Sequence, residues 1–183
     1  YEPGKLLFLN KKDNLYYINK YKPGNYEPIK PEKISDIKPW EDMVEFIVED
    51  EVEREYLLDW LGFVVQNHWV KIHSIVLIYT KHQRMGKGSI FDVMTDILGE
   101  ENAEPTDING IMDKGVTFAE KEFILVDEMK TKGNYSETKH VSNALKKLGT
   151  ERRISQRKLY VDTKVIETHT NYMIFTNNND ALN

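Results

Sequence analysis

The sequence predicts an α/β fold in which helices flank a mostly parallel sheet. Residues 74–79, 123–126 and 172–176 form short, nearly all-apolar runs, as expected of strands that are buried on both faces of a parallel sheet. Between these runs, apolar residues recur at helical spacing, first at Ile90, Met94, Ile97 and Leu98 and later at Val141, Ala144, Leu145 and Leu148. Strands that alternate with helices in this way indicate a layered α/β sheet.

The beginning of the chain is expected to form a small hairpin and a linker. Residues 5–9 and 15–21 are β-rich runs, and the turn-forming residues 10–14 lie between them. An irregular linker rich in proline follows, with Pro23, Gly24, Pro28, Pro31 and Pro39. We therefore assign residues 1–39 to an N-terminal hairpin and linker.

Residues 40–73 have a helical pattern and are expected to form a helical segment. Trp40, Val44, Ile47 and Val48 would share one face of a first helix. A second apolar stripe consists of Tyr56, Trp60, Leu61, Val64 and Val65. Residues 74–183 would then form the α/β core. Because the chain starts at Tyr1 and stops directly after an apolar run, we expect it to be a piece of a longer protein, truncated at its C-terminal side.

Composition excludes several classes of protein. The 183 residues suffice for one complete core with an appendage. The absence of cysteine removes disulfides, zinc fingers and thiol catalysis, so that a metal would be held by oxygen ligands or phosphate. No apolar run approaches the roughly 18 residues of a membrane span, and no secretory signal opens the chain. We expect a cytoplasmic protein with no membrane partner.

Charge is distributed unevenly, although the net charge is -5. Residues 41–60 contain nine acidic residues against Arg54 alone, whereas residues 139–164 contain eight Lys or Arg residues against Glu151 and Asp162. A basic segment on an acidic protein is compatible with a nucleic-acid partner. The alternative is that both runs are ordinary solvated faces.

A candidate phosphate-binding loop lies between the first predicted strand and the helix after it. Gly86-Lys87-Gly88-Ser89 can supply backbone N–H groups, a helix N-terminus and a lysine, which together suit a bound phosphate. The match to G-x-x-x-x-G-K-[ST] is degenerate, because Lys81 occupies the first glycine position and Gly88 follows Lys87. Taken alone, this string is common in loops, and it is the setting between strand and helix that favours phosphate binding.

Two further polar signatures follow predicted strands. Asp127 and Glu128 come after an apolar run; in P-loop ATPases an aspartate here helps to hold Mg²⁺ and a neighbouring acid can polarise the attacking water. Asn177 follows the last run, and its amide could bind a γ-phosphate or the water from an adjacent strand. Each signature is otherwise a plain polar turn. Ligands bind at the carboxyl ends of parallel strands, so all three signatures should meet at one edge.

In this order, the motifs resemble those of the superfamily 3 helicases of the AAA+ class, which include the helicase part of phage, plasmid and viral primase-helicases. The resemblance covers about residues 50–182. It rests on Leu57-Leu58-Asp59-Trp60-Leu61, Met85-Gly86-Lys87-Gly88-Ser89, Ile124-Leu125-Val126-Asp127-Glu128, Leu145-Lys146-Lys147-Leu148, Arg157-Lys158 and Thr176-Asn177. It implies a P-loop NTPase fold and an ATP-dependent DNA helicase motor that acts in replication and moves on single-stranded DNA.

The resemblance also implies roles for individual residues. Lys87 would contact the β- and γ-phosphates of ATP, Glu128 would be the catalytic base and Asn177 the γ-phosphate sensor. The nucleotide would lie against Met85, Gly86, Lys87, Gly88, Ser89 and Ile90. Mg²⁺ would be held by Asp127 and by Ser89, because the usual hydroxyl position is taken by Gly88. Lys81 and Arg84 stand where family members often have glycine, which restricts the backbone of the loop.

A basic hairpin is implied between the acidic pair and the last strand. Arg157, Lys158 and Tyr160 would grip single-stranded DNA through its phosphates and by stacking. The motor would work as a homo-oligomeric ring, a hexamer, in which a neighbour's arginine completes each ATP site. Two alternatives remain: an AAA+ ATPase that remodels or loads proteins without unwinding DNA, and a degenerate, non-hydrolysing P-loop module.

Overall fold

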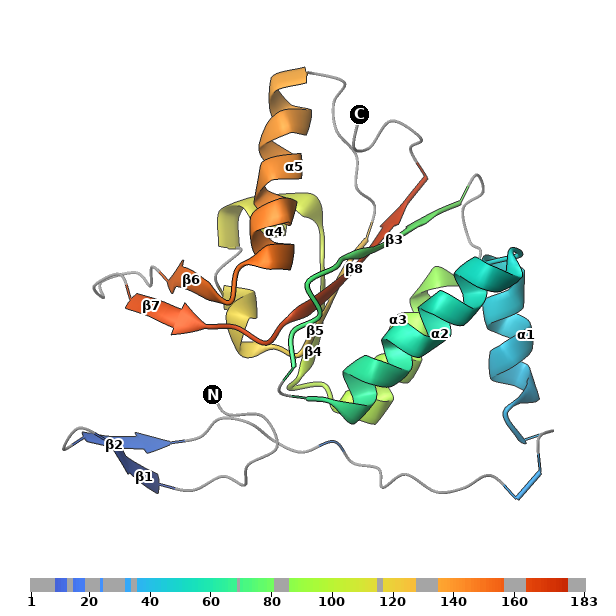
Figure 1. The fold of residues 1–183 in the computed structure, drawn as a ribbon, viewed down its shortest axis with the longest axis horizontal. Helices are drawn as coiled ribbons and strands as arrows, with labels where there is room; N and C mark the ends of the chain where they lie inside the picture. Colours follow the sequence, from blue (N-terminus) through green and yellow to red (C-terminus); the bar gives the residue numbers. More distant parts are fainter. Residues whose placement is uncertain are drawn as a thin grey trace.

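A four-stranded parallel sheet forms the centre of the fold (Figure 1). Its strands, in spatial order, are β3 (Val76–Tyr79), β8 (Asn171–Thr176), β5 (Phe123–Val126) and β4 (Ala103–Thr106). Every neighbouring pair is parallel, which confirms the predicted parallel sheet. The computed structural model describes residues 9–12, 15–18, 24, 32–33, 36–68, 70–80, 86–114, 117–127, 135–156 and 164–177.

Helices cover both faces of the sheet. Three precede or follow β3: α1 (Lys38–Ile47), α2 (Glu51–Gln66) and α3 (Lys87–Leu98). The others follow β4 and β5: α4 (Ile108–Lys114), the 3-10 helix η2 (Thr117–Glu120) and α5 (Tyr135–Thr150). Figure 1 shows α2 and α3 on one side of the sheet and α4 and α5 on the other.

The central strands bury both faces because their side chains alternate between two apolar clusters. In β5, Phe123 and Leu125 join the cluster formed with α1, α2 and α3, whereas Ile124 and Val126 join the cluster formed with α4 and α5. β8 divides its side chains in the same way. This two-sided burial explains why both strands read as continuous apolar runs.

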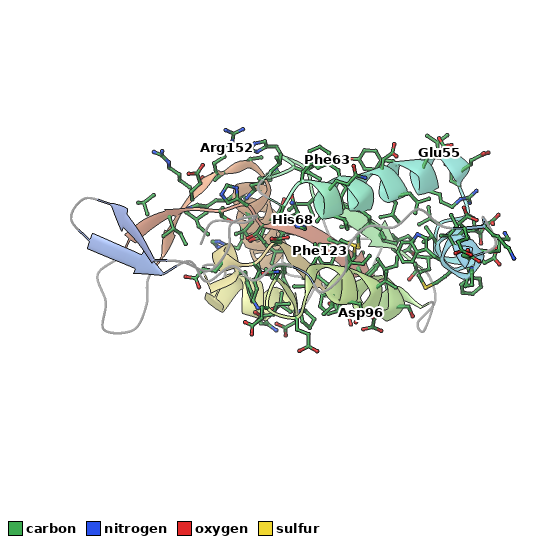
Figure 2. The ribbon with its side chains drawn as sticks, turned by 90° about the horizontal axis from the view of Figure 1, so that it is seen from below. Glu55, Phe63, His68, Asp96, Phe123 and Arg152 are labelled. Atoms are coloured by element: carbon green, nitrogen blue, oxygen red, sulfur yellow. The ribbon has the colours of Figure 1, made fainter. Side chains whose placement is uncertain are left out.

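Aromatic packing joins the sheet to the first helical layer. The ring of Phe123 is 6.3 Å from that of Trp60 in α2 and 6.1 Å from that of Phe91 in α3, measured between centroids. Figure 2 shows Phe123 between these two helices, with Glu55 on the outer side of α2 and Asp96 on the outer side of α3. Aromatic side chains therefore pack between the helices and the sheet, and Glu55 and Asp96 lie on the outer sides of the two helices.

Two antiparallel hairpins lie outside the main sheet. β1 (Leu9–Lys12) pairs with β2 (Leu15–Ile18), and β6 (Arg153–Gln156) pairs with β7 (Lys164–Glu167). The predicted N-terminal hairpin is confirmed, but its turn was misplaced: Asn10, Lys11 and Lys12 belong to β1 and pair across the ladder. Backbone hydrogen bonding between strands does not require apolar side chains, and β1 therefore continues through these three polar residues. Residues 5–8 and 19–21, also predicted as strand, lie outside the described part.

The helical segment is confirmed with two corrections. Pro39, predicted in the linker, lies in the first turn of α1, where a proline has no intrahelical hydrogen bond to lose. Tyr56, predicted in the buried stripe of α2, is 56% exposed. The buried residues are Leu57, Trp60, Leu61 and Val64, whose i, i+3, i+4, i+7 spacing leaves Tyr56 about one residue, or about 100°, off the stripe.

β4 is the strand that the sequence did not predict. Its residues, Ala-Glu-Pro-Thr, are polar and include a proline, and its burial is only partial. It lies at one end of the strand order, where a proline is tolerated because one side of the strand needs no ladder bonds. Among the helices of the described residues, none has the length and apolar character needed to cross a membrane.

Candidate functional site

The carboxyl ends of β3, β8 and β5 lie side by side at one edge of the sheet. Tyr79 is paired with Thr176, and Val126 with Ile174, so that Thr80, Asn177 and Asp127 follow on three adjacent strands. The N–H of Thr80 donates to the carbonyl of Thr176 at 3.0 Å, which extends the ladder to this edge. Two of the three predicted signatures, Asp127 and Asn177, are therefore found at the same edge.

The chain segments that follow β3 and β5 leave this edge toward opposite faces of the sheet. α3, which follows β3, packs in the cluster with α1 and α2, whereas α5, which follows β5, packs in the other cluster. β8 lies between β3 and β5. In open α/β sheets, such a change of side opens a crevice at the carboxyl ends of the strands, where ligands bind. The crevice would lie beside β8, next to Asn177.

Gly86 begins α3 in a conformation that suits glycine. Its φ is 77° and its ψ 12°, in the left-handed region, and its carbonyl accepts a hydrogen bond from the N–H of Ser89 at 2.9 Å. The helix has no side-chain cap and no acidic residue in its first turn. Its N-terminal N–H groups and dipole therefore favour an anion.

The rest of the predicted loop is described in part. Gly88 is exposed and an added Cβ would meet nothing within 4 Å, so there is open space beside the first turn of α3. Ser89 is half-buried, and Ile90 is completely buried in the core, which anchors the turn. Met85 and the side chain of Lys87 lie outside the described part, as does Glu128.

Asn177 is positioned by a residue that the sequence analysis did not single out. Oγ1 of Thr80 donates a hydrogen bond to Oδ1 of Asn177 at 3.1 Å. The two residues occupy equivalent places on neighbouring parallel strands, one step beyond the Tyr79–Thr176 pair. A hydroxyl directly after an apolar strand was the available signal, because pairing of the two strands brings it opposite the amide.

Asp127 and Ser89 offer oxygen atoms of the kind that bind a magnesium ion shared with a phosphate. Asp127 is exposed at the end of β5, and Ser89 provides a hydroxyl in α3. Within the described residues there is no group of three His, Cys, Asp or Glu side chains that could hold a metal by themselves. Mg²⁺ is usually bound by one or two protein oxygens together with substrate phosphates, and this donor set fits that pattern.

A groove of about 980 Å³ runs along β3 and reaches the site only at Thr80. It is lined by the end of α1, the start of α2 and the length of β3, with Glu49, Asp50 and Glu53 among its residues. Gly86, Asp127 and Asn177 do not line it. Its carboxylates would repel a triphosphate, so we place the candidate site at the strand ends and not in this groove.

The basic hairpin lies at the other end of the sheet. Arg152 and Arg153 are exposed, and the carbonyl of Arg152 accepts from the N–H of Thr168, three residues before β8 begins. β6 and β7 therefore emerge from the amino-terminal edge, opposite Asn177, and Figure 1 shows them projecting there. The predicted hairpin is confirmed as a structure, whereas Arg157, Lys158 and Tyr160 lie outside the described residues.

Solved structures share this fold. Two apo structures of the C-terminal region of NrS-1 superpose with TM-scores of 0.77 and 0.72, each at 19% sequence identity, and a third does so with a TM-score of 0.69 at 17% identity. The matches cover 96–97% of this chain but only 41–42% of those chains. The chain thus spans about two fifths of the length of these structures, and at this identity the likeness concerns the fold.

Sequence comparisons match a smaller part of the chain than the structural comparisons do. No curated protein matches the chain. The sequence profile described as "Family of unknown function (DUF5906)" matches residues 78–183, which include the end of β3, the loop, α3, Asp127, the basic hairpin and Asn177. Because this match covers more than half of the chain, the protein belongs to the DUF5906 family.

Proposed function

We propose that this chain is the nucleotide-binding core of an ATP-dependent DNA helicase motor with a role in replication. The observation that carries the proposal is the position of Thr80, Asn177 and Asp127 directly after three adjacent parallel strands. The N-terminus of α3, which has no side-chain cap, follows β3 in the chain. A P-loop ATPase needs these parts at one edge: a phosphate cradle, an acidic residue and a polar sensor. The similarity in fold to the C-terminal region of NrS-1 is consistent with the proposal.

The proposed chemistry assigns a task to each residue. The N–H groups at the start of α3 and the Lys87 ammonium would bind the triphosphate. Asp127 and Ser89 would hold Mg²⁺, which when bound offsets charge on the phosphate oxygens. Glu128 would accept a proton from the attacking water. Asn177, oriented by Thr80, would donate from Nδ2 to the γ-phosphate or to that water.

The second half of the proposal concerns DNA. Arg157, Lys158 and Tyr160 belong to the segment between β6 and β7, and their charges and ring would bind a single strand without reading its sequence. The hairpin is connected to the candidate ATP site by α5 on one side and β8 on the other. Binding at the two ends of the sheet would then be coupled through these two elements, in a ring of subunits.

Calorimetric titration with ATP and Mg²⁺ tests the nucleotide site. The parent should bind, and Lys87→Ala should lower the affinity by at least about tenfold, the effect of removing about 1.4 kcal/mol of interaction. Lys147→Ala is a matched control, because Lys147 is an exposed lysine on α5. Equal heats for the parent and Lys87→Ala would disprove the assignment of the loop.

Fluorescence anisotropy with a labelled oligothymidylate tests the DNA site and separates the helicase from a protein-remodelling ATPase. The double variant Arg157→Ala, Lys158→Ala should bind more weakly and with a lower salt dependence, by about 0.7 in slope for each DNA phosphate that is no longer neutralised. Lys146→Ala, Lys147→Ala removes the same charge from α5 and should bind like the parent. Equal affinity of the two double variants would contradict the DNA-binding role.

A further inference from the structure

Lys71 is a buried lysine at the amino-terminal edge of the sheet, away from the candidate ATP site. Its side chain is only 7% exposed. Its Nζ donates hydrogen bonds to the carbonyl of Leu148 at 2.5 Å and to that of Glu151 at 3.0 Å. These carbonyls belong to the last turn of α5 and to the residue after it, where backbone acceptors lack partners within the helix. Lys71 therefore caps the C-terminus of α5 from another part of the chain.

The positive charge of Lys71 is also favourable at the C-terminus of α5. The C-terminus of a helix carries partial negative charge, which a cation stabilises, and the ring of Tyr172 lies 5.8 Å from Nζ on β8. Burial lowers the pKa of Lys71 to about 8, and the carboxylate of Glu151 opposes this shift. The amine thus stays mostly protonated at neutral pH. An apolar side chain could fill the same space, but it could not satisfy the carbonyls.

Neighbours of Lys71 hold the same junction. Nδ1 of His73 lies 3.1 Å from the carbonyl oxygen of Thr150, and Nε of Arg152 donates to Nε2 of His73 at 3.4 Å. Both contacts are made together when Nδ1 carries the proton of the ring. The segment around Lys71 therefore contacts the end of α5 and both residues, 151 and 152, that connect it to β6.

The other side of this segment is attached to the start of β8. Oδ1 of Asn171 accepts from the N–H of Ile72 at 2.8 Å, and its Nδ2 donates to the carbonyl of Val70 at 3.2 Å. Asn171 itself is 3% exposed. β7 reaches Asn171 through residues 168–170. The chain enters the β6–β7 hairpin from α5 and leaves it into β8. Segment 70–73 is hydrogen-bonded both to the end of α5 and to the start of β8, and therefore holds both ends of the hairpin.

We propose that Lys71 is a positioning residue for the β6–β7 hairpin: it ties the exit of α5 to the base of β8, so that the hairpin keeps a set direction relative to the sheet. This role rests on the proposed function in so far as the hairpin binds DNA. Without the cap, the last turn of α5 would open, and the hairpin would sample directions that bind a single strand less well. In the absence of DNA, when nothing is bound at the hairpin to be coupled to it, the nucleotide site at the opposite edge would keep its affinity for ATP.

The test compares Lys71→Met, which keeps the length of the side chain, with the parent. Hydrogen exchange read by mass spectrometry should become at least about tenfold faster for amides at the end of α5 and in β6 and β7, as expected when a local network of hydrogen bonds is loosened. Affinity for a labelled oligothymidylate should fall about tenfold, while affinity for ATP and Mg²⁺ should stay within about twofold.

Val44→Ala is the control for a general loss of stability, because Val44 is completely buried and belongs to α1, a helix that lies far from β6 and β7 in Figure 1. It should lower the melting temperature without changing exchange in the hairpin or the affinity for DNA. If Lys71→Met resembles Val44→Ala in these two measurements, or does not fold under conditions where Val44→Ala does, Lys71 is a stability residue and the positioning role is overturned. A parent that binds no DNA would contradict the proposed function alone, because hydrogen exchange still decides the role of Lys71.

Discussion

The hydroxyl of Thr80 donates a hydrogen bond to Oδ1 of Asn177, with 3.1 Å between the two oxygens, at the carboxyl edge of the sheet. Thr80 is 6% exposed, and its N–H is bonded to the carbonyl of Thr176, so the donor is itself held in place. The bond occupies the amide oxygen of Asn177. The Nδ2 group is consequently directed away from Thr80, in the orientation in which it can serve as a donor.

Thr80→Val tests this relationship, because valine keeps the shape of threonine and lacks the hydroxyl. In the full-length protein, we expect the rate of ATP hydrolysis to fall by about tenfold, less than the roughly 100-fold typical of losing a direct donor to the transition state. ATP affinity should remain within about twofold, since the loop is untouched. Thr80→Ser retains the donor and should hydrolyse ATP at nearly the parent rate. Hydrolysis by Thr80→Val at the parent rate would show that Asn177 does not depend on this bond.

Gly86→Ala and Gly88→Ala form a matched pair that tests the start of α3. Gly86 has a φ of 77°, which costs an alanine about 1–2 kcal/mol, although its Cβ would meet only Cδ1 of Ile47 at 3.9 Å. Gly88 is helical with open space around it, so alanine there should stabilise by up to about 1 kcal/mol. Urea unfolding should therefore give shifts of opposite sign. A Gly86→Ala protein as stable as the parent would contradict the left-handed geometry.

The sequence predicted the central strands and the edge they share because both depend on simple patterns. β5 and β8 are buried on both faces, and their apolar runs are therefore unbroken. The polar residue after each run then marks the carboxyl edge, which is how Asp127 and Asn177 were found. Only the positions of Asp127 and Asn177 at this edge are confirmed; their predicted roles, like those of Ser89, Lys87, Glu128 and the hairpin tip, remain predictions.

Features that depend on contacts between distant parts of the chain could not be predicted from local sequence patterns. β4 is polar and contains Pro105, and it becomes a strand only because β5 offers a parallel partner. Thr80 gains a role only when β3 and β8 lie side by side. The hydrogen bond from Lys71 to Leu148 spans 77 residues, and no local spacing could indicate it. Tyr56 shows the opposite error, since an apolar residue next to a buried stripe was assigned to the core.

Asp50 caps α2, and its removal should weaken the helix that holds Trp60 against Phe123. A carboxylate oxygen of Asp50 accepts a hydrogen bond from the N–H of Glu53 at 3.0 Å. Asp50→Ala should lower the free energy of unfolding by about 1 kcal/mol, as is usual for the loss of a helix cap. Asp50→Asn keeps the acceptor and should lose less. Equal losses for the two variants in urea unfolding would mean that charge near the helix end, and not the cap bond, provides the stabilisation.

His68 and Glu122 should make stability depend on pH. Nδ1 of His68, at the end of α2 (Figure 2), lies 2.8 Å from Oε2 of Glu122, whose side chain is 2% exposed. The hydrogen bond to Glu122, together with its charge, raises the pKa of His68 above 6.5, although burial of the ring opposes the shift. The protonated ring therefore binds Glu122 more favourably in the folded protein than in the unfolded chain.

A raised pKa in the folded state means that this stabilisation is fully present below the unfolded value of 6.5 and is lost as pH rises through the folded value. His68→Gln should therefore lose more stability relative to the parent at pH 5.5 than at pH 8.5, with a loss at low pH of about 1.5–3 kcal/mol for a hydrogen bond between charged groups. Urea unfolding at several pH values measures the difference, and the NMR titration of the His68 ring measures its pKa directly. His140→Gln, which replaces an exposed histidine on α5, controls for general effects of the substitution. A ring that titrates at or below 6.5, or a loss that does not change with pH, would show that the pair contributes as neutral groups and that Glu122 is stabilised by its other contacts.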